Sequence, residues 1–287
     1  MANIKAAVQN GAARISLFGD ARLLGKEYWK KLTALLSHEE MPFVLYMELF
    51  SPATEEYMRA WRSVTSGKII MALSPESADA KVRRALGKNY SNEEIINQVV
   101  LGFDQNIRVS LGFMFPLPEQ DFTSIVRTQE FINNTCRRFN RLIGYMYEPI
   151  LFIDPGSLIF DEPEKYGYRI EDRTLEGLVH ALNRPHWYYS LNYSTAWMSK
   201  KEIIEAIFFI GRSRNRLTME FLGRSERNLF HQSLIAQQER LITVLEENSH
   251  LKDEEVEGLI EATIDQTLRQ MNLSITMPDV DLLNIAE

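Results

Sequence analysis

Short apolar runs and amphipathic stretches alternate through the first half of the chain. The apolar runs predict strands at residues 15–18, 43–47, 68–73, 108–115 and 145–153, and the stretches between them predict helices at residues 28–36, 52–61, 91–100 and 122–136. Near-continuous apolar strands separated by helices are typical of a parallel sheet covered on both faces. The pattern therefore predicts an α/β fold.

Acidic residues close three successive predicted strands at a constant spacing. Steps of 28 residues separate Asp20 from Glu48 and Glu48 from Glu76, which is the length of one strand and one helix. A repeated step of this length favours a barrel-like (β/α) arrangement. We predict an incomplete (β/α) TIM-like barrel over residues 1–160.

The remaining residues, 161–287, have a different pattern. Residues 160–197 are rich in aromatic side chains and irregular, and helical periodicity begins after Ser199. Two predicted helix faces carry apolar residues, namely Leu229, Leu234, Leu241 and Leu245 on one and Val256, Leu259, Ile260, Ile264 and Leu268 on the other. We expect an aromatic-rich connector, a mostly helical C-terminal region and a loose tail from Met277 onward.

Composition narrows the class of protein. The 287 residues are 45% hydrophobic and carry a formal net charge of -7, which argues against a nucleic-acid-binding surface. The single cysteine, Cys136, excludes a disulfide framework and indicates a reducing compartment. No apolar run reaches the roughly 20 residues of a membrane span, and residues 1–5 have no apolar signal core. We expect a cytoplasmic protein without a nucleic-acid or membrane partner.

Carboxylates lie at or near four predicted strand ends, at Asp20, Glu48, Glu76 and Glu148. Parallel strands present their carboxyl ends at one edge, so these groups are candidates to bind a polar cofactor or substrate, or a divalent metal as in a barrel hydrolase. The alternative is that each carboxylate caps the helix that follows, because acids favour helix N-termini. Both interpretations stay open.

Glu76 and Ser77 are the sharpest candidates. They follow Pro75 at a strand-to-helix turn, where a carboxylate can accept hydrogen bonds from a ribose diol and a hydroxyl can donate one. The structural alternative is that Ser77 caps a helix over residues 78–86. Lys88 either pairs with a ligand carboxylate or is a solvated lysine at a helix C-terminus.

Other motifs give weaker signals. The side chains of Phe113, Met114 and Phe115 either form an apolar slot for an adenine or pack in the core. The chain has no P-loop and no GxGxxG sequence, and its histidines lack metal-ligand spacing. Cys136 has no evident paired base and is interpreted as a buried free thiol.

Taken in order, several segments resemble radical S-adenosylmethionine (SAM) enzymes of the cobalamin-binding type. The resemblance covers roughly residues 14–210 and rests on the runs Glu48-Leu49-Phe50, Ser74-Pro75-Glu76-Ser77, Gly87-Lys88-Asn89-Tyr90-Ser91, Phe113-Met114-Phe115-Pro116-Leu117-Pro118-Glu119-Gln120 and Asp154-Pro155-Gly156-Ser157.

The resemblance implies a partial (β/α)₆ barrel, a [4Fe-4S] cluster that reductively cleaves SAM, and a cobalamin that often carries a methyl group. By position, Glu76 and Ser77 would contact the SAM ribose or methionine portion, and Lys88 would meet the SAM carboxylate. Met114 and Phe115 would lie near the adenine, and Glu48 and Asp20 would bind the cofactor from neighbouring strand ends.

The chain departs from this family in two ways. It lacks the CxxxCxxC sequence that binds the cluster, and it lacks the family's cobalamin domain. We therefore expect the SAM-binding barrel portion of such an enzyme, which performs radical-based methylation or rearrangement of a small molecule and is inactive alone. A cluster-bearing subunit or a missing N-terminal segment would complete it. The alternative is a non-catalytic interaction or scaffold protein built on a degenerate barrel.

Overall fold

The computed structural model describes residues 4, 6–7, 10–37, 43–140, 143–150, 152–182 and 191–221, and residues 235–236, 239–240, 243–244, 247, 258 and 262. These residues belong to two compact units, Met1–Ile150 and Leu151–Glu287. The change in sequence pattern predicts a domain boundary ten residues later, near residue 160. Each unit is described by itself below.

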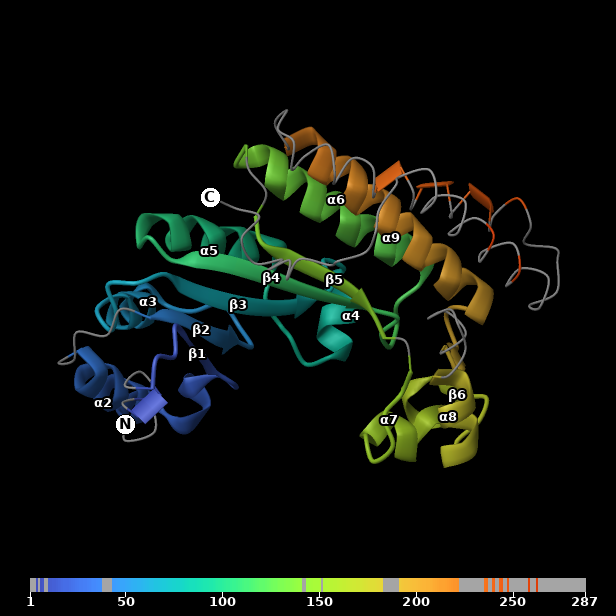
Figure 1. Cartoon of the computed structure of the whole chain (residues 1–287), viewed down its shortest axis with the longest axis horizontal. Coiled ribbons are helices and arrows are strands. Elements are labelled where there is room, and N and C mark those ends of the chain that lie inside the picture. The colour runs from blue at the N-terminus through green and yellow to red at the C-terminus, as the bar shows by residue number, and fades with distance from the viewer. Residues whose placement is uncertain are drawn as a thin grey trace. The chain divides into compact units, whose positions relative to one another are not determined.

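The first unit alternates strands and helices (Figure 1). Its elements are β1 (Arg14–Leu17), the 3-10 helix η1 (Ala21–Leu24), α2 (Lys26–Ser37), β2 (Val44–Leu49), α3 (Glu55–Arg62), β3 (Ile69–Glu76), α4 (Ala80–Ala85), α5 (Asn92–Asp104), β4 (Arg108–Phe115), α6 (Phe122–Arg138) and β5 (Tyr145–Pro149). All five predicted strands are present, and the predicted α/β class is confirmed.

The five strands form one parallel sheet in the order β1-β2-β3-β4-β5. Strands that are neighbours in the chain are therefore neighbours in the sheet, as Figure 1 shows. Crossovers between parallel strands are right-handed, so this order places every connecting helix on the same face. Among the described residues the sheet is open, and it is not a complete barrel.

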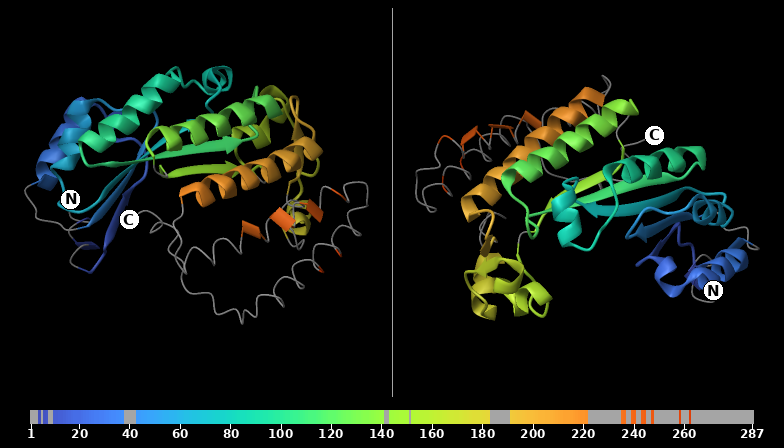
Figure 2. Two further views of the ribbon diagram at one scale, coloured as in Figure 1. Left: turned by 90° about the horizontal axis from the view of Figure 1, so that it is seen from above. Right: turned by 180° about the vertical axis from the view of Figure 1, so that it is seen from behind.

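One face of the sheet is buried under these helices. In β2, Leu45, Met47 and Leu49 are buried, and the residues between them are only half-buried. Helix α5 lies so close that a Cβ at Gly102 would be 2.5 Å from the Val109 side chain of β4. Figure 2 shows α5 and α6 along the sheet, and Phe131 of α6 meets Phe113 of β4 edge-to-face.

The opposite face is half-exposed, which corrects the prediction of a sheet covered on both sides. Because side chains alternate along a strand, every second residue of β2 and β4 points away from the helices. We call this surface the open face; it comprises Ser16, Tyr46, Glu48, Ile70, Ala72, Ser74, Arg108, Ser110, Gly112, Met114, Met146 and Glu148. The short strand β1 has no buried residue at all.

The second unit contains short elements and one long helix. These are α7 (Leu158–Asp161), η2 (Pro163–Tyr166), β6 (Tyr168–Ile170), α8 (Leu175–Leu182), β7 (Tyr193–Thr195) and α9 (Lys200–Phe221), and β6 pairs with β7 antiparallel. Helix α9 confirms the helical prediction after Ser199. The two further predicted helix faces and the tail lie outside the described residues. No helix in the described part of the chain is long and apolar enough to cross a membrane.

Candidate functional site

Asp20 connects the carboxyl ends of β1 and β2. Its carboxylate accepts hydrogen bonds from the Phe50 amide, at 3.0 Å, and from the Arg22 amide and guanidinium, with Nη2 at 2.5 Å. The Arg22 guanidinium also donates to the Ser51 and Pro52 carbonyls. This arrangement fixes the turn after β1 against the end of β2. Asp20 also caps η1, so the helix-capping alternative holds for this carboxylate.

Two opposing effects set the ionisation of Asp20. Burial is the largest influence and by itself raises the pKa of this carboxyl. The hydrogen bonds from Arg22 and the Phe50 amide together outweigh it and hold the pKa of Asp20 below its usual value. Asp20 is therefore a carboxylate at neutral pH, with most of its acceptor capacity already used by the protein.

Glu48 lies on the open face of β2 and reaches the same turn. Its Oε2 accepts a hydrogen bond from the Gly19 amide at 2.7 Å. The structure thus brings Asp20 and Glu48 together, each bonded to the backbone of the neighbouring strand end. Tyr46, two residues before Glu48, has a raised pKa because of burial and then the charge of Glu48. Its phenol is therefore a hydrogen-bond donor at neutral pH.

Glu76 ends β3 in an unusual backbone conformation. Strand β3 extends three residues beyond the predicted end, and its pairing with β4 shifts register between Leu73 and Glu76. Glu76 has φ 65°, in the left-handed region. This conformation costs an L-residue other than glycine about 1–2 kcal/mol. Bulges next to functional sites redirect side chains, and this one redirects the Glu76 carboxylate.

The structure brings Glu76 and Lys88 together. Lys88 Nζ lies 2.6 Å from Glu76 Oε1 and also donates to the Ser74 carbonyl. Both side chains are mostly buried, with 17% of Lys88 and 16% of Glu76 exposed. In the described part of the chain, Glu76 Oε2 accepts no hydrogen bond. A cation and a partly available carboxylate therefore lie side by side at the carboxyl end of β3.

Tyr90 completes this cluster and is not among the site residues predicted from the sequence. Its hydroxyl donates to the Ser74 carbonyl at 3.3 Å, so Lys88 and Tyr90 meet at one acceptor. Burial, and then the negative charge of Glu76, raise the pKa of Tyr90 above its ordinary value. The only sequence signal for Tyr90 is its position two residues after Lys88.

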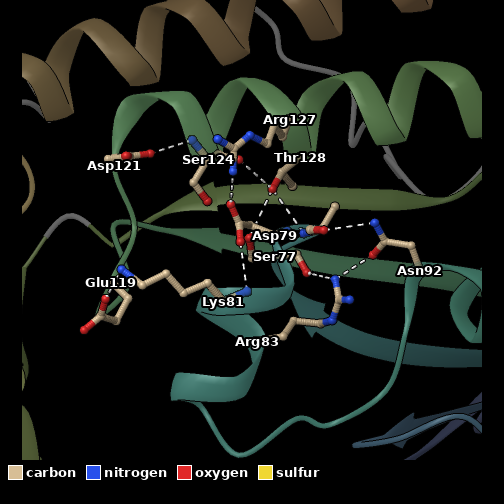
Figure 3. A network of polar contacts seen from close by, with 11 residues as sticks. Ser77, Asp79, Lys81, Arg83, Asn92, Glu119, Asp121, Ser124, Arg127 and Thr128 are labelled. Carbon is tan, nitrogen blue, oxygen red and sulfur yellow. Dashed lines mark hydrogen bonds and ion pairs between the residues drawn. The ribbon is translucent and has the colours of Figure 1, made fainter.

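Ser77 lies in the core of the protein, within the network of Figure 3. Its hydroxyl is 3.1 Å from Thr128 Oγ1 of α6 and accepts a hydrogen bond from the Asp79 amide. The predicted N-cap role of Ser77 is wrong, because Asp79 caps α4 through the Lys81 amide. A fully buried hydroxyl with these partners connects β3 to α4 and α6. Its hydroxyl is therefore bonded within the core, and its predicted contact with the cofactor stays a prediction.

Arg83 is a buried member of this network that the site prediction did not include. Its guanidinium donates to the Ser77 carbonyl at 2.9 Å and to Asn92 Oδ1 at 2.6 Å (Figure 3). It also donates to the Tyr90 carbonyl at 3.0 Å. Burial lowers the pKa of Arg83. Arg83 therefore fixes the loop that carries Lys88 and Tyr90 against the end of β3.

Met114 and Phe115 point to opposite sides of β4. Met114 is 37% exposed on the open face, whereas Phe115 is fully buried and packs edge-to-face on Tyr147. Neighbouring residues of a strand alternate, so the predicted slot of consecutive side chains cannot form, and Phe115 and Phe113 belong to the core. Glu148 of β5 lies opposite Met114 and is exposed.

The described residues do not fit an iron-sulfur cluster or a metal ion. No group of three or more histidine, cysteine, aspartate or glutamate side chains is close enough to hold a metal in the part of the chain that the structure describes. Cys136, the single cysteine of the sequence, is buried in α6. A cluster ligated by three cysteines cannot form from this sequence.

Comparisons with known proteins find similarity among solved structures. No protein-family model matches the chain, and no curated protein matches it. The solved structure of the apo, selenomethionine-labelled cobalamin-dependent S-adenosylmethionine radical enzyme OxsB is similar over 94% of this chain, with a TM-score of 0.47 and 12% sequence identity. The chain spans 44% of the length of that structure.

Proposed function

We propose that this chain is the SAM-binding barrel portion of a cobalamin-type radical SAM enzyme, and that it holds the adenosyl part of SAM at the carboxyl ends of β3 and β4. The observation that carries the proposal is the conformation of Glu76. A register shift and a left-handed backbone conformation at this residue direct its carboxylate toward Lys88. Strain of this kind concentrates at ligand-binding sites, where it holds a side chain in position before the ligand arrives.

Each residue of the site has a distinct proposed role. Glu76 accepts hydrogen bonds from the ribose diol, for which its Oε2 is available, and Lys88 moves from Glu76 to the SAM carboxylate. Met114, exposed on the open face, lies against the adenine. Asp20 and Glu48 hold the neighbouring strand ends in place by accepting hydrogen bonds from the Phe50 and Gly19 amides. The exposed side of the Glu48 side chain contacts the cofactor.

The radical chemistry is proposed to require cysteines from outside this sequence. When bound, a [4Fe-4S] cluster supplies the electron that cleaves SAM, and Cys136 alone cannot hold one. We assign no catalytic step to the residues of this chain and expect it to be inactive alone. The reaction of the complete enzyme would be radical-based methylation or rearrangement of a small molecule, with cobalamin held outside this chain.

A cluster-bearing polypeptide is proposed to bind along β1. In the described part of the chain β1 pairs only with β2, which leaves an edge that can accept another strand. Beside it, Phe18, Leu23 and Leu24 are 84%, 72% and 64% exposed, on a turn that Arg22 holds in place. Exposed apolar groups of this kind mark protein-protein contacts. Sedimentation of the isolated chain tests this: a dimer disrupted by Leu24→Glu would assign the group to a second copy and contradict the proposal.

Calorimetry with two ligands tests the cofactor site. SAM and 5′-deoxyadenosine share the ribose diol, and the second lacks the methionine part, so it reports on Glu76 independently of any cluster. We expect 5′-deoxyadenosine to bind, and Glu76→Gln to weaken its binding about tenfold, because a charge-assisted hydrogen bond becomes a neutral one. Glu130→Gln, an exposed change on α6, is the matched control. Binding that Glu76→Gln leaves unchanged would refute the proposed role.

The second candidate is a non-catalytic interaction protein on a degenerate barrel. The exposed group of Phe18, Leu23 and Leu24 favours this candidate, because such a group can bind a partner protein whether or not the chain binds a cofactor. The same calorimetry separates the two candidates. Absence of heat with both SAM and 5′-deoxyadenosine favours the interaction protein, and binding that depends on Glu76 favours the cofactor site.

A further inference from the structure

Gly112 leaves a gap in the row of side chains that β4 presents on the open face. Ser110 and Met114 precede and follow it on this face, because side chains alternate along a strand. Ser74 of β3 and Met146 of β5 lie on its two sides: a Cβ at Gly112 would be 3.1 Å from Ser74 Oγ, and the register pairs Gly112 with Met146. The four side chains that border the gap are uncharged, so the gap favours an uncharged ligand.

The backbone of β4 forms the floor of this gap. Glycine inside a strand has no side chain to pack, and it often marks a place where a ligand approaches the backbone closely. Met114 and Met146 border the floor and are 37% and 48% exposed. A planar ring fits this shape, because it can lie flat on the strand between side chains that project further.

The methionine side chains suit an aromatic ring in particular. A thioether is flexible and polarizable, and its sulfur makes favourable contacts at the edge of an aromatic ring. Met146 is the side chain in the same row as Gly112, whereas Met114 lies one row further toward the carboxyl end of β4. Met146 is therefore the methionine that contacts a ring placed on Gly112.

Ser74 supplies a polar group at the edge of the gap. Its carbonyl accepts hydrogen bonds from Lys88 and Tyr90, which hold the backbone of this residue in place. Its hydroxyl is half-buried and has no hydrogen-bond partner among the described residues. A hydroxyl can donate or accept a hydrogen bond, so it can pair with a polar atom of a ligand.

We infer that the gap at Gly112 binds a planar, uncharged ring with a hydrogen-bonding group at its edge. Met146 contacts the ring, and Ser74 bonds the group at its edge. Ser74 lies two residues before Glu76 on β3, so the ring lies beside the proposed cofactor site and belongs to the substrate. The assignment to the substrate rests on the proposed function, and the binding of a ring does not.

Nuclear magnetic resonance of the full chain with methyl-labelled methionine tests the site. The probes are phenol, cyclohexanol, which carries the same hydroxyl on a ring that is not planar, and toluene, which has the planar ring without the hydroxyl. We expect phenol to shift the Met146 methyl signal in a saturable way and to bind severalfold more tightly than either other probe. Met146→Gln assigns the signal by removing it. The inference is overturned if phenol leaves this signal unchanged, or if either other probe binds as tightly as phenol.

Matched variants are compared through the proton signals of phenol itself. Gly112→Val fills the gap and should remove the binding, whereas Gly211→Ala, in α9 where a Cβ meets nothing within 4 Å, should leave it unchanged. Ser74→Ala should weaken phenol binding severalfold and leave toluene binding unchanged, and Ser16→Ala, on the open face of β1, is its control. If Gly112→Val does not fold, Met146→Gln replaces it and should weaken binding severalfold. Phenol binding that Ser74→Ala leaves unchanged, or that the variant filling or bordering the gap leaves unchanged, overturns the inference.

A mixture with 5′-deoxyadenosine separates this inference from the proposed cofactor site. The nucleoside, placed against Met114, should shift the Met114 methyl signal and leave the affinity for phenol unchanged. If the nucleoside displaces phenol, the gap is the place of the adenine, and the inference is overturned while the proposed function stands. If phenol binds and the nucleoside does not, the proposed function fails and the ring site stands.

Discussion

Replacing Asp20 with asparagine tests how the ends of β1 and β2 are held together. The side chain of Asp20 is 3% exposed and accepts hydrogen bonds from the Phe50 amide and from three donors of Arg22. Asparagine keeps the shape but removes the charge and turns an NH2 group toward one set of these donors. Breaking a buried pair costs about 3–5 kcal/mol. Because Arg22 is 21% exposed and keeps two carbonyl partners, we expect a smaller loss of about 2–3 kcal/mol in the free energy of unfolding.

The loss should depend on pH in a defined direction. The folded protein holds the pKa of Asp20 below its usual value, and the unfolded value is about 3.9. The stabilisation is therefore complete above the unfolded pKa and is lost as pH falls through the folded pKa. Urea unfolding, followed by the fluorescence of the buried Trp29 and Trp61, should show the full difference at pH 6–7 and a shrinking difference below about pH 4.

An exposed aspartate provides the control. Asp104→Asn, at the end of α5, should change stability by less than about 0.5 kcal/mol across the same pH range. Equal stability of Asp20→Asn and the unmodified protein at pH 7 would show that the carboxylate does not hold the two strand ends. A difference that stays constant down to pH 3.5 would show that it acts through its shape rather than its charge.

Substitutions at three residues test the end of β3 and its network by urea unfolding. Glu76→Gly should leave the protein about 1 kcal/mol more stable than Glu76→Ala. Both variants lose the ion pair with Lys88, and only glycine adopts φ 65° without strain. Equal stability would mean that the backbone is unstrained. Ser77→Ala should cost about 1–2 kcal/mol because the Asp79 amide loses its side-chain partner and Thr128 loses one of its contacts. Unchanged stability would mean that the Ser77 hydroxyl does not stabilise the network. Arg83→Met should cost about 2–4 kcal/mol because three oxygens lose their partner, of which the Ser77 carbonyl is buried and the other two are partly buried. Rescue by Arg83→Lys would contradict a role that depends on the guanidinium shape.

The local pattern of the chain predicts its elements well. Apolar runs mark the five strands, and the capping box of Ser91 and Glu94 that opens α5 is present with both hydrogen bonds. These features depend on residues close in sequence, whose conformational preferences act without the rest of the fold. The equal spacing of Asp20, Glu48 and Glu76 also indicates a real repeat, because each lies at or just beyond a strand of one parallel sheet.

Contacts between distant residues were not predictable in the same way. The partner of Ser77 is Thr128, which lies 51 residues away on α6, and only the packing of that helix on the sheet brings them together. The register shift at Glu76 likewise depends on pairing with β4. The pattern also overstated the cover of the sheet, since apolar strand residues such as Ile70 and Met146 lie on the open face. The order of the strands in the sheet decides which face the helices cover, and this order depends on how all five strands pair.

The position of bound 5′-deoxyadenosine tests the central claim most directly. A crystal structure of the full chain with this nucleoside should show its ribose diol within about 3 Å of the Glu76 carboxylate, with Lys88 displaced from Glu76 Oε1. Nucleoside bound elsewhere in the protein, with the pair of Glu76 and Lys88 intact, would contradict the account.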